Sequence, residues 1–314
     1  FIIKKKISIF SIFDIIKILK TNLKSNYKNI FISNQNYANI VAIIVKFFFN
    51  KFKLILIERN HLDELKNYFN LIYYFKKKIL ILLMKILYKK SDAIIGVSKK
   101  LSYDLSRLVN KEIITIYNPA SDFSSIKNIK PKKYKKKIGL NILSVGHLTY
   151  QKDYSTTFKA LKILKKKNIR FFYNLIGNGF LSNDLKLQVK YLGLKNYVKF
   201  HENVKNPINF YKNSDLFILS SIYEGMGNVV VESIYHSCPV IVSKCNSGPN
   251  EIIKNGLYGD NFNVGNSKQL ANKIINYYKN TQILKDKTQK GKKNLYPFSI
   301  KKNISDFNLV LKKI

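Results

Sequence analysis

Cysteine is scarce in this chain of 314 residues, which limits the kinds of site that the chain can build. The only two, Cys238 and Cys245, lie seven positions apart, which fits neither a disulfide framework nor the spacing of zinc ligands. Reduced, partly buried thiols of this kind are typical of proteins from the cytosol. We therefore expect a cytoplasmic protein without disulfide bonds.

Acidic residues and arginine are also scarce. The chain has 18 Asp and Glu against 56 Lys and Arg, a formal net charge of +38, and its only arginines are Arg59, Arg107 and Arg170. Proteins that read nucleic acids usually rely on arginine, which bonds phosphates and guanine edges bidentately. The abundant Lys, Ile, Asn, Tyr and Phe are typical of an AT-rich genome, but such a bias does not explain the shortage of acids. A basic surface remains, suited to anionic lipid, a diphosphate ligand or nucleic acid.

Long apolar runs are absent as well. No uninterrupted run reaches the roughly 18 residues that a membrane-spanning helix needs. No signal peptide with a small-residue cleavage site is present either. The chain begins at Phe1 without an initiator methionine, so we expect it to be a fragment.

Short apolar blocks alternate with longer amphipathic ones along the chain, which predicts an α/β fold with parallel sheets. A lysine-rich stretch interrupts the pattern, and we expect an N-terminal domain at 1–130, a linker at 131–138, a C-terminal domain at 139–300 and a last helix at 301–314 that packs back on the first domain. Strands are predicted at 29–33, 53–57, 93–97, 113–117, 141–145, 171–176, 198–200, 216–220 and 240–242. Helices are predicted at 1–26, 37–49, 66–90, 99–109, 154–166, 181–192, 207–213, 228–236, 269–279 and 304–314. Both halves are therefore predicted to be doubly wound.

Five glycines of the second half follow a predicted strand within a few residues and precede a predicted helix. They are Gly146, Gly177, Gly179, Gly225 and Gly227. Ligands of open parallel sheets bind at the carboxyl ends of the strands, and glycine before a helix N-terminus lets the backbone approach a phosphate. Any one of these glycines is explained as well by an ordinary turn. Five at one edge of one sheet favour an anion site.

The few glutamates are concentrated near the same edge. Three of the seven, Glu224, Glu232 and Glu251, lie within 28 residues. Glu224 precedes a Gly-x-Gly turn and Glu232 lies about one turn into the next helix, so both carboxylates can face one pocket and bond vicinal sugar hydroxyls. Spacing alone also allows Glu232 merely to complement the helix N-terminus.

Residues 223–233, YEGMGNVVVES, resemble the E-x7-E motif of glycosyltransferase family 4, also called group 1. Other blocks similar to that family follow in the same order and are clearest between residues 141 and 260. In the second half they are residues 144–148, 151–153, 175–179, 214–221, 239–242 and 247–253. In the first half the similarity is looser, at residues 38–42, 57–60, 91–98 and 117–119.

This resemblance implies the GT-B fold, with two Rossmann-like domains that face a cleft and the donor held mainly by the second. It implies that Glu232 accepts hydrogen bonds from the ribose, that Glu224 contacts the donor sugar, and that Lys152 neutralises the diphosphate leaving group. The other donor-side residues implied are Gly146, His147, Gly177, Gly179, Gly225, Met226, Gly227, Asn228 and Glu251. On the acceptor side it implies Asn39, Arg59, Asn60 and His61, with Arg59 counted as catalytic beside Glu224 and Lys152.

The sequence contains no Asp-x-Asp pair for a metal-bound diphosphate. We therefore expect no metal ion and no cofactor, because lysine and helix dipoles can take the cation's place. Members of the family retain anomeric configuration without an evident protein nucleophile, so none is assigned.

Two departures from the family pattern concern His147 and the beginning of the chain. His147 stands where the family typically has arginine, so diphosphate binding should be weaker or pH-dependent unless Lys152 carries the charge alone. The family's opening strand and Gly-rich loop are not found, and residues 1–26 have a helical pattern instead. We expect the first domain to be truncated.

Residues 71–90 combine aromatic and aliphatic side chains with six lysines. This composition is typical of a helix that lies on a membrane surface, although a core-facing helix with a solvated lysine face fits equally well. With the net charge, it favours peripheral contact with anionic lipid on the cytoplasmic face of the inner membrane.

These features together predict a metal-independent, retaining hexosyltransferase. It would move a hexose or N-acetylhexosamine from a nucleotide-sugar, with UDP the expected nucleotide, to a glycan or lipid-linked acceptor in bacterial surface-polysaccharide or lipid-linked oligosaccharide assembly. One alternative is a basic nucleic-acid-binding protein, but only the charge favours it and no recognition motif is present, so we expect no nucleic acid partner. The other is a sugar-nucleotide epimerase of the GT-B fold, which the E-x7-E segment does not support.

Overall fold

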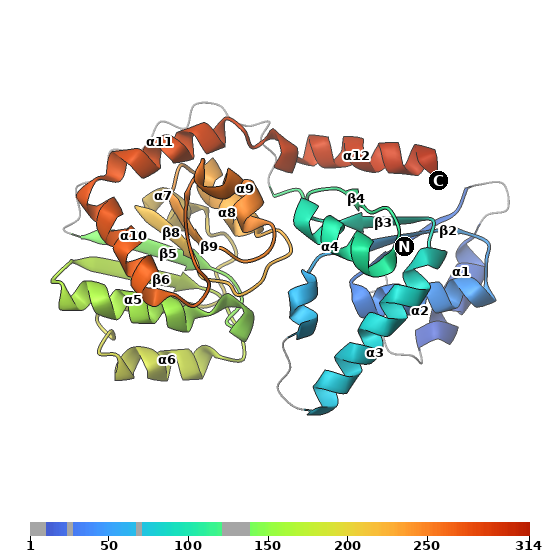
Figure 1. Cartoon of the computed structure of the whole chain (residues 1–314), viewed down its shortest axis with the longest axis horizontal. Helices are drawn as coiled ribbons and strands as arrows, with labels where there is room; N and C mark the ends of the chain where they lie inside the picture. The colour runs from blue at the N-terminus through green and yellow to red at the C-terminus, as the bar shows by residue number, and fades with distance from the viewer. Residues whose placement is uncertain (1–10, 24–27, 67–70, 121–138) are drawn as a thin grey trace. The chain divides into compact units, whose positions relative to one another are not determined.

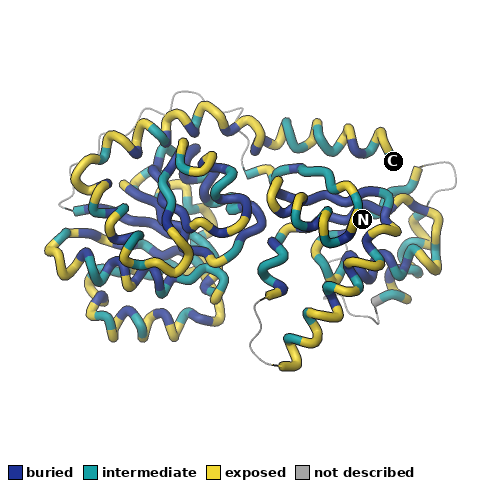
Figure 2. Tube along the Cα trace, viewed as in Figure 1, coloured by how far each residue is buried: buried dark blue, intermediate teal, exposed yellow. Residues whose placement is uncertain are grey.

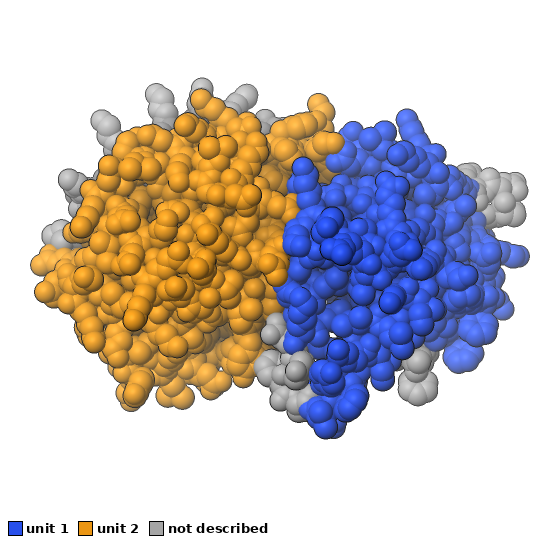
Figure 3. Space-filling view, viewed as in Figure 1, with its two compact units in different colours: residues 1–117, 304–314 blue, residues 118–303 orange. Residues whose placement is uncertain are grey.

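The computed structural model describes residues 11–23, 28–66, 71–120 and 139–314, and these form two compact units. The first consists of Phe1–Tyr117 with Ile304–Ile314, and the second of Asn118–Asn303 (Figure 3). Each unit has its own parallel sheet and its own hydrophobic core. The predicted linker at 131–138 lies outside the described residues.

The first unit is built on four parallel strands in the order β1-β2-β3-β4 (Figure 1). The strands are β1 Ile30–Asn34, β2 Lys53–Glu58, β3 Ala93–Gly96 and β4 Ile114–Thr115. The helices are α1 Ser11–Asn22, α2 Asn36–Phe48, α3 Leu71–Leu87, α4 Lys99–Val109 and α12 Ile300–Lys313, with 3₁₀ turns η1 Leu62–Lys66 and η2 Tyr88–Lys90. The last part of α12 belongs to this unit, where Val310 is buried and Lys28 Nζ lies 3.5 Å from the Leu311 carbonyl oxygen.

Local signals explain where these elements begin and end. Strand β2 is a continuous buried run after the exposed Lys53, as expected for a parallel strand covered on both faces. Helix α4 begins after Ser98, whose hydroxyl accepts a hydrogen bond from the Leu101 N–H, and it ends at Asn110 in the left-handed conformation.

The helix predicted at 66–90 is wrong in its boundaries. Its first residue, Lys66, belongs to a 3₁₀ turn, and the α-helix described here runs only from Leu71 to Leu87. The last turn tightens into 3₁₀ geometry because both the N–H and the hydroxyl of Ser91 donate to the Tyr88 carbonyl.

The second unit is built on six parallel strands (Figure 1). They are β5 Leu140–Val145, β6 Phe171–Ile176, β7 Val198–His201, β8 Leu216–Leu219, β9 Val240–Ser243 and β10 Asp260–Phe262. The helices are α5 Tyr154–Lys166, α6 Ser182–Tyr191, α7 Ile208–Asn213, α8 Asn228–Tyr235, α9 Pro249–Ile252, α10 Ser267–Lys279 and α11 Thr281–Lys292. The 3₁₀ turns are η4 Tyr150–Lys152, η5 Lys254–Gly256 and η6 Tyr296–Phe298.

The strand order of this sheet is β10-β9-β8-β5-β6-β7. Numbered within the unit, this is the Rossmann order, in which the chain starts in the middle, winds to one edge and then crosses back to the other half. The direction of winding reverses between β5 and β8, which are paired at Ile142↔Leu216 and Leu143↔Phe217. The chain therefore leads from these two strands to helices on opposite faces of the sheet, which makes this position a topological switch point.

Alternating residues of this sheet face two different layers of helices. One core cluster joins β5, β6 and β8 to α5, α6 and α10, with Phe158, Tyr173 and Ile274 among its fully buried side chains. On α8, Val230 and Ile234 are also fully buried, and this helix contacts β8 and β9. Figure 2 shows the consequence, with buried strands inside and helices that are exposed on their outer faces. The predicted doubly wound architecture of the second half is confirmed.

Three elements of the second unit differ from the sequence prediction. Strand β10, helix α11 and the short helix α9, which begins at Pro249, were not predicted. Proline suits the first turn of a helix, since that position needs no N–H donor. No helix in the described ranges is long and apolar enough to cross a membrane.

Candidate functional site

The loops after β5 and β8 meet at the carboxyl edge of the second unit's sheet. Inside the sheet, the Ser144 hydroxyl of β5 donates to the Ile218 carbonyl of β8 at 2.6 Å. Beyond it, the Ile222 N–H donates to the Gln151 carbonyl at 2.8 Å, and the Gln151 side chain donates to the Tyr223 carbonyl at 3.0 Å. The two segments that carry the predicted donor-side residues are thus held together by several hydrogen bonds.

Lys152 and Glu224 form an ion pair at this point. Lys152 Nζ lies 2.5 Å from Glu224 Oε1, and both side chains are largely buried. The Ser221 hydroxyl donates to the same carboxylate oxygen at 2.6 Å, and the Ser220 hydroxyl donates to the Lys152 carbonyl at 2.8 Å. The resemblance gave these two residues separate roles, whereas the structure places them in direct contact. Breaking this pair would leave a poorly solvated charge behind, so each residue holds the other in place.

Glu232 has a different partner, which was not predicted. It lies on α8, and its Oε2 accepts a hydrogen bond from the Tyr211 hydroxyl of α7 at 2.8 Å. Partial burial raises the pKa of Glu232, while the bond from Tyr211 lowers it. Glu224 and Glu232 both follow β8, but within the described residues no side chain bonds both of their carboxylates. Tyr211 could have been found only as a buried tyrosine on a short helix, since nothing in its spacing relates it to Glu232.

Helix α8 begins within the same segment. Its N-cap, Gly227, has φ 84°, a conformation that other residues rarely adopt. The first N–H groups of a helix have no partner inside it, so this terminus can bind an anion. Gly225 and Met226, which precede the cap, are buried, and the Met226 sulfur accepts a hydrogen bond from the Asn118 N–H at 3.2 Å.

Close packing explains the glycines after β6. A Cβ atom on Gly177 would lie 1.9 Å from the Gly146 carbonyl oxygen, and one on Gly179 would lie 2.3 Å from the Leu148 carbonyl oxygen. Glycine is needed here because the loops after β5 and β6 touch through their backbones. An ordinary structural role therefore accounts for Gly177 and Gly179 without a ligand.

The remaining donor-side residues occupy the same edge. His147 is exposed in the loop after β5, Asn228 is half-buried at the start of α8, and Glu251 is half-buried in α9. The buried side-chain oxygen of Asn228 has no hydrogen-bond partner within the described part of the chain.

The acceptor-side residues belong to the first unit, with Asn39 on α2 and the other three directly after β2, and two of the four are buried. Asn39 is fully buried, and its amide donates to the Ile57 carbonyl at 3.1 Å and to Glu58 Oε1 at 2.8 Å. Tyr88 donates a short hydrogen bond to the same Glu58 oxygen, and burial raises the pKa of Glu58 to about 7. This network stabilises the unit itself, so Asn39 packs α2 against β2.

Next along the chain, Arg59 is exposed and Asn60 is half-buried. His61 is buried, with Nε2 3.0 Å from Asp104 Oδ2 and Nδ1 accepting from the Asp63 N–H at 3.2 Å. Arg59 and Asn60 are thus more accessible to a ligand than Asn39 or His61.

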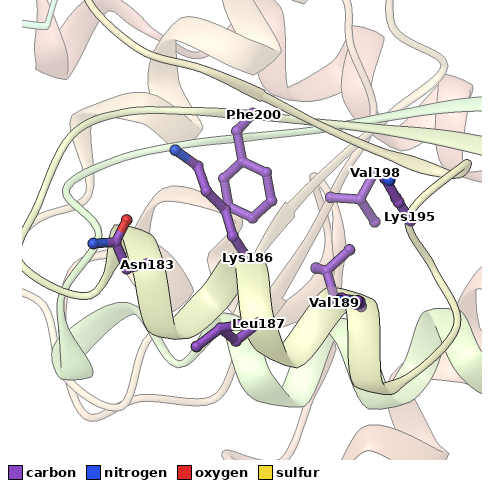
Figure 4. A pocket seen from close by; sticks show the side chains of 8 residues that line it. Asn183, Lys186, Leu187, Val189, Lys195, Val198 and Phe200 are labelled. Carbon is purple, nitrogen blue, oxygen red and sulfur yellow. The ribbon is translucent and has the colours of Figure 1, made fainter.

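A pocket of about 500 Å³ lies elsewhere in the second unit, beside α6 and the edge strand β7. Figure 4 shows it lined by Leu187, Val189, Val198 and Phe200, with the Lys186 side chain alongside. It contains none of the predicted site residues. Across the ranges that the structure describes, no three His, Cys, Asp or Glu side chains are grouped so as to hold a metal ion.

Comparison with known proteins gives the family. The family model of glycosyl transferases, group 1, matches residues 125–294, which is more than half of the chain, and the chain belongs to this family. It is 31% identical over 265 residues to an uncharacterized glycosyltransferase of Methanocaldococcus jannaschii, a match that covers 76% of this chain and 60% of that protein. It is 28% identical over 292 residues to a Campylobacter jejuni N-acetylgalactosamine-N,N'-diacetylbacillosaminyl-diphospho-undecaprenol 4-alpha-N-acetylgalactosaminyltransferase, covering 88% of this chain and 72% of that protein.

Solved structures give the same fold at lower identity. Anabaena HepE, crystallised with UDP, has a TM-score of 0.75 at 18% identity, covering 96% of this chain and 82% of that one. Sucrose-phosphate synthase of Thermosynechococcus elongatus has a TM-score of 0.82 at 15% identity, covering 100% of this chain and 80% of that one. The predicted GT-B fold and group 1 membership are confirmed, while assignment to family 4 in particular stays a prediction.

Proposed function

We propose that this glycosyltransferase moves a hexose or N-acetylhexosamine, with retention and without a metal ion, from a UDP-sugar to a glycan or lipid-linked acceptor. One observation carries the donor part of the proposal. At the switch point of the Rossmann sheet, the Lys152–Glu224 pair joins the segments that follow β5 and β8. The segment after β8 leads into the N-terminus of α8, and this helix carries Glu232. Ligands of such sheets bind at this crevice.

The chemistry of these groups suits a nucleoside diphosphate. The Lys152 ammonium and the α8 N-terminus offer positive charge where the leaving diphosphate gains negative charge. Glu224, held by Lys152 and Ser221, can accept from a sugar hydroxyl, and Glu232 can accept from the ribose. HepE was crystallised with UDP and with UDP-glucose, which supports the choice of UDP.

Relatives support a lipid-linked acceptor. Two Campylobacter jejuni relatives are named for diphospho-undecaprenol or PP-undecaprenol substrates, and a Staphylococcus aureus relative is named for capsular polysaccharide biosynthesis. We place this activity at the cytoplasmic face of the inner membrane, where the enzyme would bind a lipid-linked acceptor.

Helix α3 supplies the proposed membrane contact. Its residues Ile72, Phe75, Ile79, Leu82 and Ile86 repeat at intervals of three and four, so they form one stripe, and each is more than half exposed. The helix contains lysines and no acidic residue. A second copy of the chain would bring like charges together here, whereas an anionic bilayer would accept both the stripe and the lysines.

A transfer assay tests the enzyme proposal. UDP-hexoses and UDP-N-acetylhexosamines labelled in the sugar are incubated with the chain, EDTA and lipid extracted from bacterial inner membranes. We expect label in the lipid or polysaccharide product, retained anomeric configuration by NMR, and a loss of roughly 100-fold or more in Lys152→Met, because that variant lacks charge stabilisation of the leaving group.

The matched control is Lys268→Met, which removes an exposed lysine of α10 and should leave transfer unchanged. Transfer that appears only when a divalent cation is added would contradict the metal-independent mechanism. Equal rates for Lys152→Met and the wild type would contradict the proposed leaving-group site.

A further inference from the structure

Tyr211 is a buried side chain to which neither the sequence pattern nor the proposed function gives a role. It lies on α7, outside the segment that joins β8 to α8, and it is only 1% exposed. Its hydroxyl donates to Glu232 Oε2 at 2.8 Å. Across the described residues, this is the one hydrogen bond that the structure gives to the Glu232 carboxylate.

Packing fixes the direction of that hydroxyl. The Tyr211 ring lies 5.8 Å from the ring of Phe217 on β8 and 5.9 Å from the ring of His236, and it is stacked on His236 at an interplanar angle of 19°. These neighbours come from the strand before Glu232 and from the end of its own helix. Tyrosine also has few side-chain torsions to order, so the hydroxyl is held at a nearly constant position.

The bond leaves Glu232 prepared to bind a ligand. The Tyr211 hydroxyl bonds Glu232 Oε2 and so restricts rotation of the carboxylate, while Oε1 accepts no hydrogen bond from the described residues and can accept one from a ligand. Glu232 is partly buried, which favours its neutral form, and the hydrogen bond from Tyr211 opposes that tendency. An ionised and oriented carboxylate is the form that binds vicinal hydroxyls best.

We propose that Tyr211 is a positioning residue, which holds the Glu232 carboxylate in the orientation that binds the two ribose hydroxyls of the donor nucleotide. The inference rests on the proposed donor site. It adds a residue from a separate helix and states which part of the ligand that residue affects. Tyr211 itself need not touch the ligand.

The test compares ligands with and without the ribose hydroxyls. Calorimetric dissociation constants are measured for whichever of UDP and GDP binds more tightly, and for its 2′,3′-dideoxy form, with wild type, Tyr211→Phe, Glu232→Ala and the double variant. Tyr211→Phe removes only the hydroxyl and keeps the ring contacts. We expect it to weaken nucleotide binding about tenfold, as for loss of a hydrogen bond to a charged group, and to leave binding of the dideoxy form unchanged.

The double variant and a control separate positioning from a general effect on folding. In the Glu232→Ala background, Tyr211→Phe should cause no further loss. Tyr277→Phe removes another buried tyrosine hydroxyl, which donates to the Asp215 carbonyl at 2.7 Å, and it should leave both dissociation constants unchanged.

Equal weakening of both ligands by Tyr211→Phe, or no weakening where Glu232→Ala does weaken binding, overturns the positioning role and leaves the donor site standing. Failure of the wild type to bind UDP or GDP overturns the donor site and this inference together.

Discussion

At the scale of single residues, Glu58 makes the folding stability of the first unit depend on pH. Burial raises its pKa from 4.5 to about 7, so the folded chain holds a proton that the unfolded chain releases between these values. The associated stability is fully present below about pH 4.5 and is lost as pH rises through about 7. A shift of this size corresponds to at most about 3 kcal/mol of unfolding free energy.

Urea unfolding of wild type and Glu58→Gln at pH 5 and pH 7.5 measures this effect. Glutamine keeps the shape but does not titrate, so the wild type should lose stability relative to the variant on going to the higher pH. The control is Glu112→Gln, at an exposed position, for which the difference should not change with pH. If the difference in unfolding free energy between wild type and Glu58→Gln were also the same at both pH values, a buried Glu58 that titrates between them would be contradicted.

The sequence identified individual site residues better than their contacts. Lys152, Glu224 and Glu232 could be selected because acids are few and lie near glycine turns, and because they match a motif. The Lys152–Glu224 and Tyr211–Glu232 contacts join residues 72 and 21 positions apart, so they depend on the order of strands in the sheet. No local pattern specifies that order. Gly177 was selected for phosphate binding, but its close approach to the Gly146 carbonyl explains it without a ligand.

At the scale of elements, the exposed stripe of α3 predicts binding to anionic vesicles. Replacing Ile79 and Leu82 by glutamine should weaken binding to phosphatidylglycerol-containing vesicles, measured by co-sedimentation, roughly tenfold or more. The reason is that two apolar side chains no longer enter the bilayer surface. Nucleotide binding should stay unchanged. The matched control replaces Leu257 and Ile283, exposed apolar residues of the second unit, by glutamine. Equal vesicle binding by the two double variants, or binding that does not need anionic lipid, would contradict the role of α3.

Elements with regular apolar spacing and marked ends could be predicted, whereas strand β10 and helix α11 were missed. Helices α4 and α5 and strand β6 have the predicted boundaries because their apolar spacing is regular and their ends are marked by capping or turn residues. Helix α11 was missed because its buried positions are Leu284, Thr288 and Gly291, of which only one is strongly apolar. Strand β10 has three residues and buries only Phe262, so it has no readable alternation.

At the scale of the whole molecule, composition and family membership constrain different properties. The net charge of +38 indicates anionic partners but does not distinguish lipid, nucleotide and nucleic acid. The group 1 match gives the family, and the Rossmann strand order gives the fold of the second unit. The sugar and the acceptor are recognised by side-chain contacts, for which the strand order provides only the scaffold.

We expect the second unit to bind the donor nucleotide at its switch point through Glu232. Calorimetric titration of UDP and GDP into wild type, Glu232→Ala and the exposed control Glu112→Ala, in moderately high salt without divalent metal, tests it most directly. We predict that one nucleotide binds to wild type and control alike and about tenfold or more weakly to Glu232→Ala, since the ribose loses a charge-assisted hydrogen bond. Binding that ignores Glu232, or that disappears in salt, would contradict the claim.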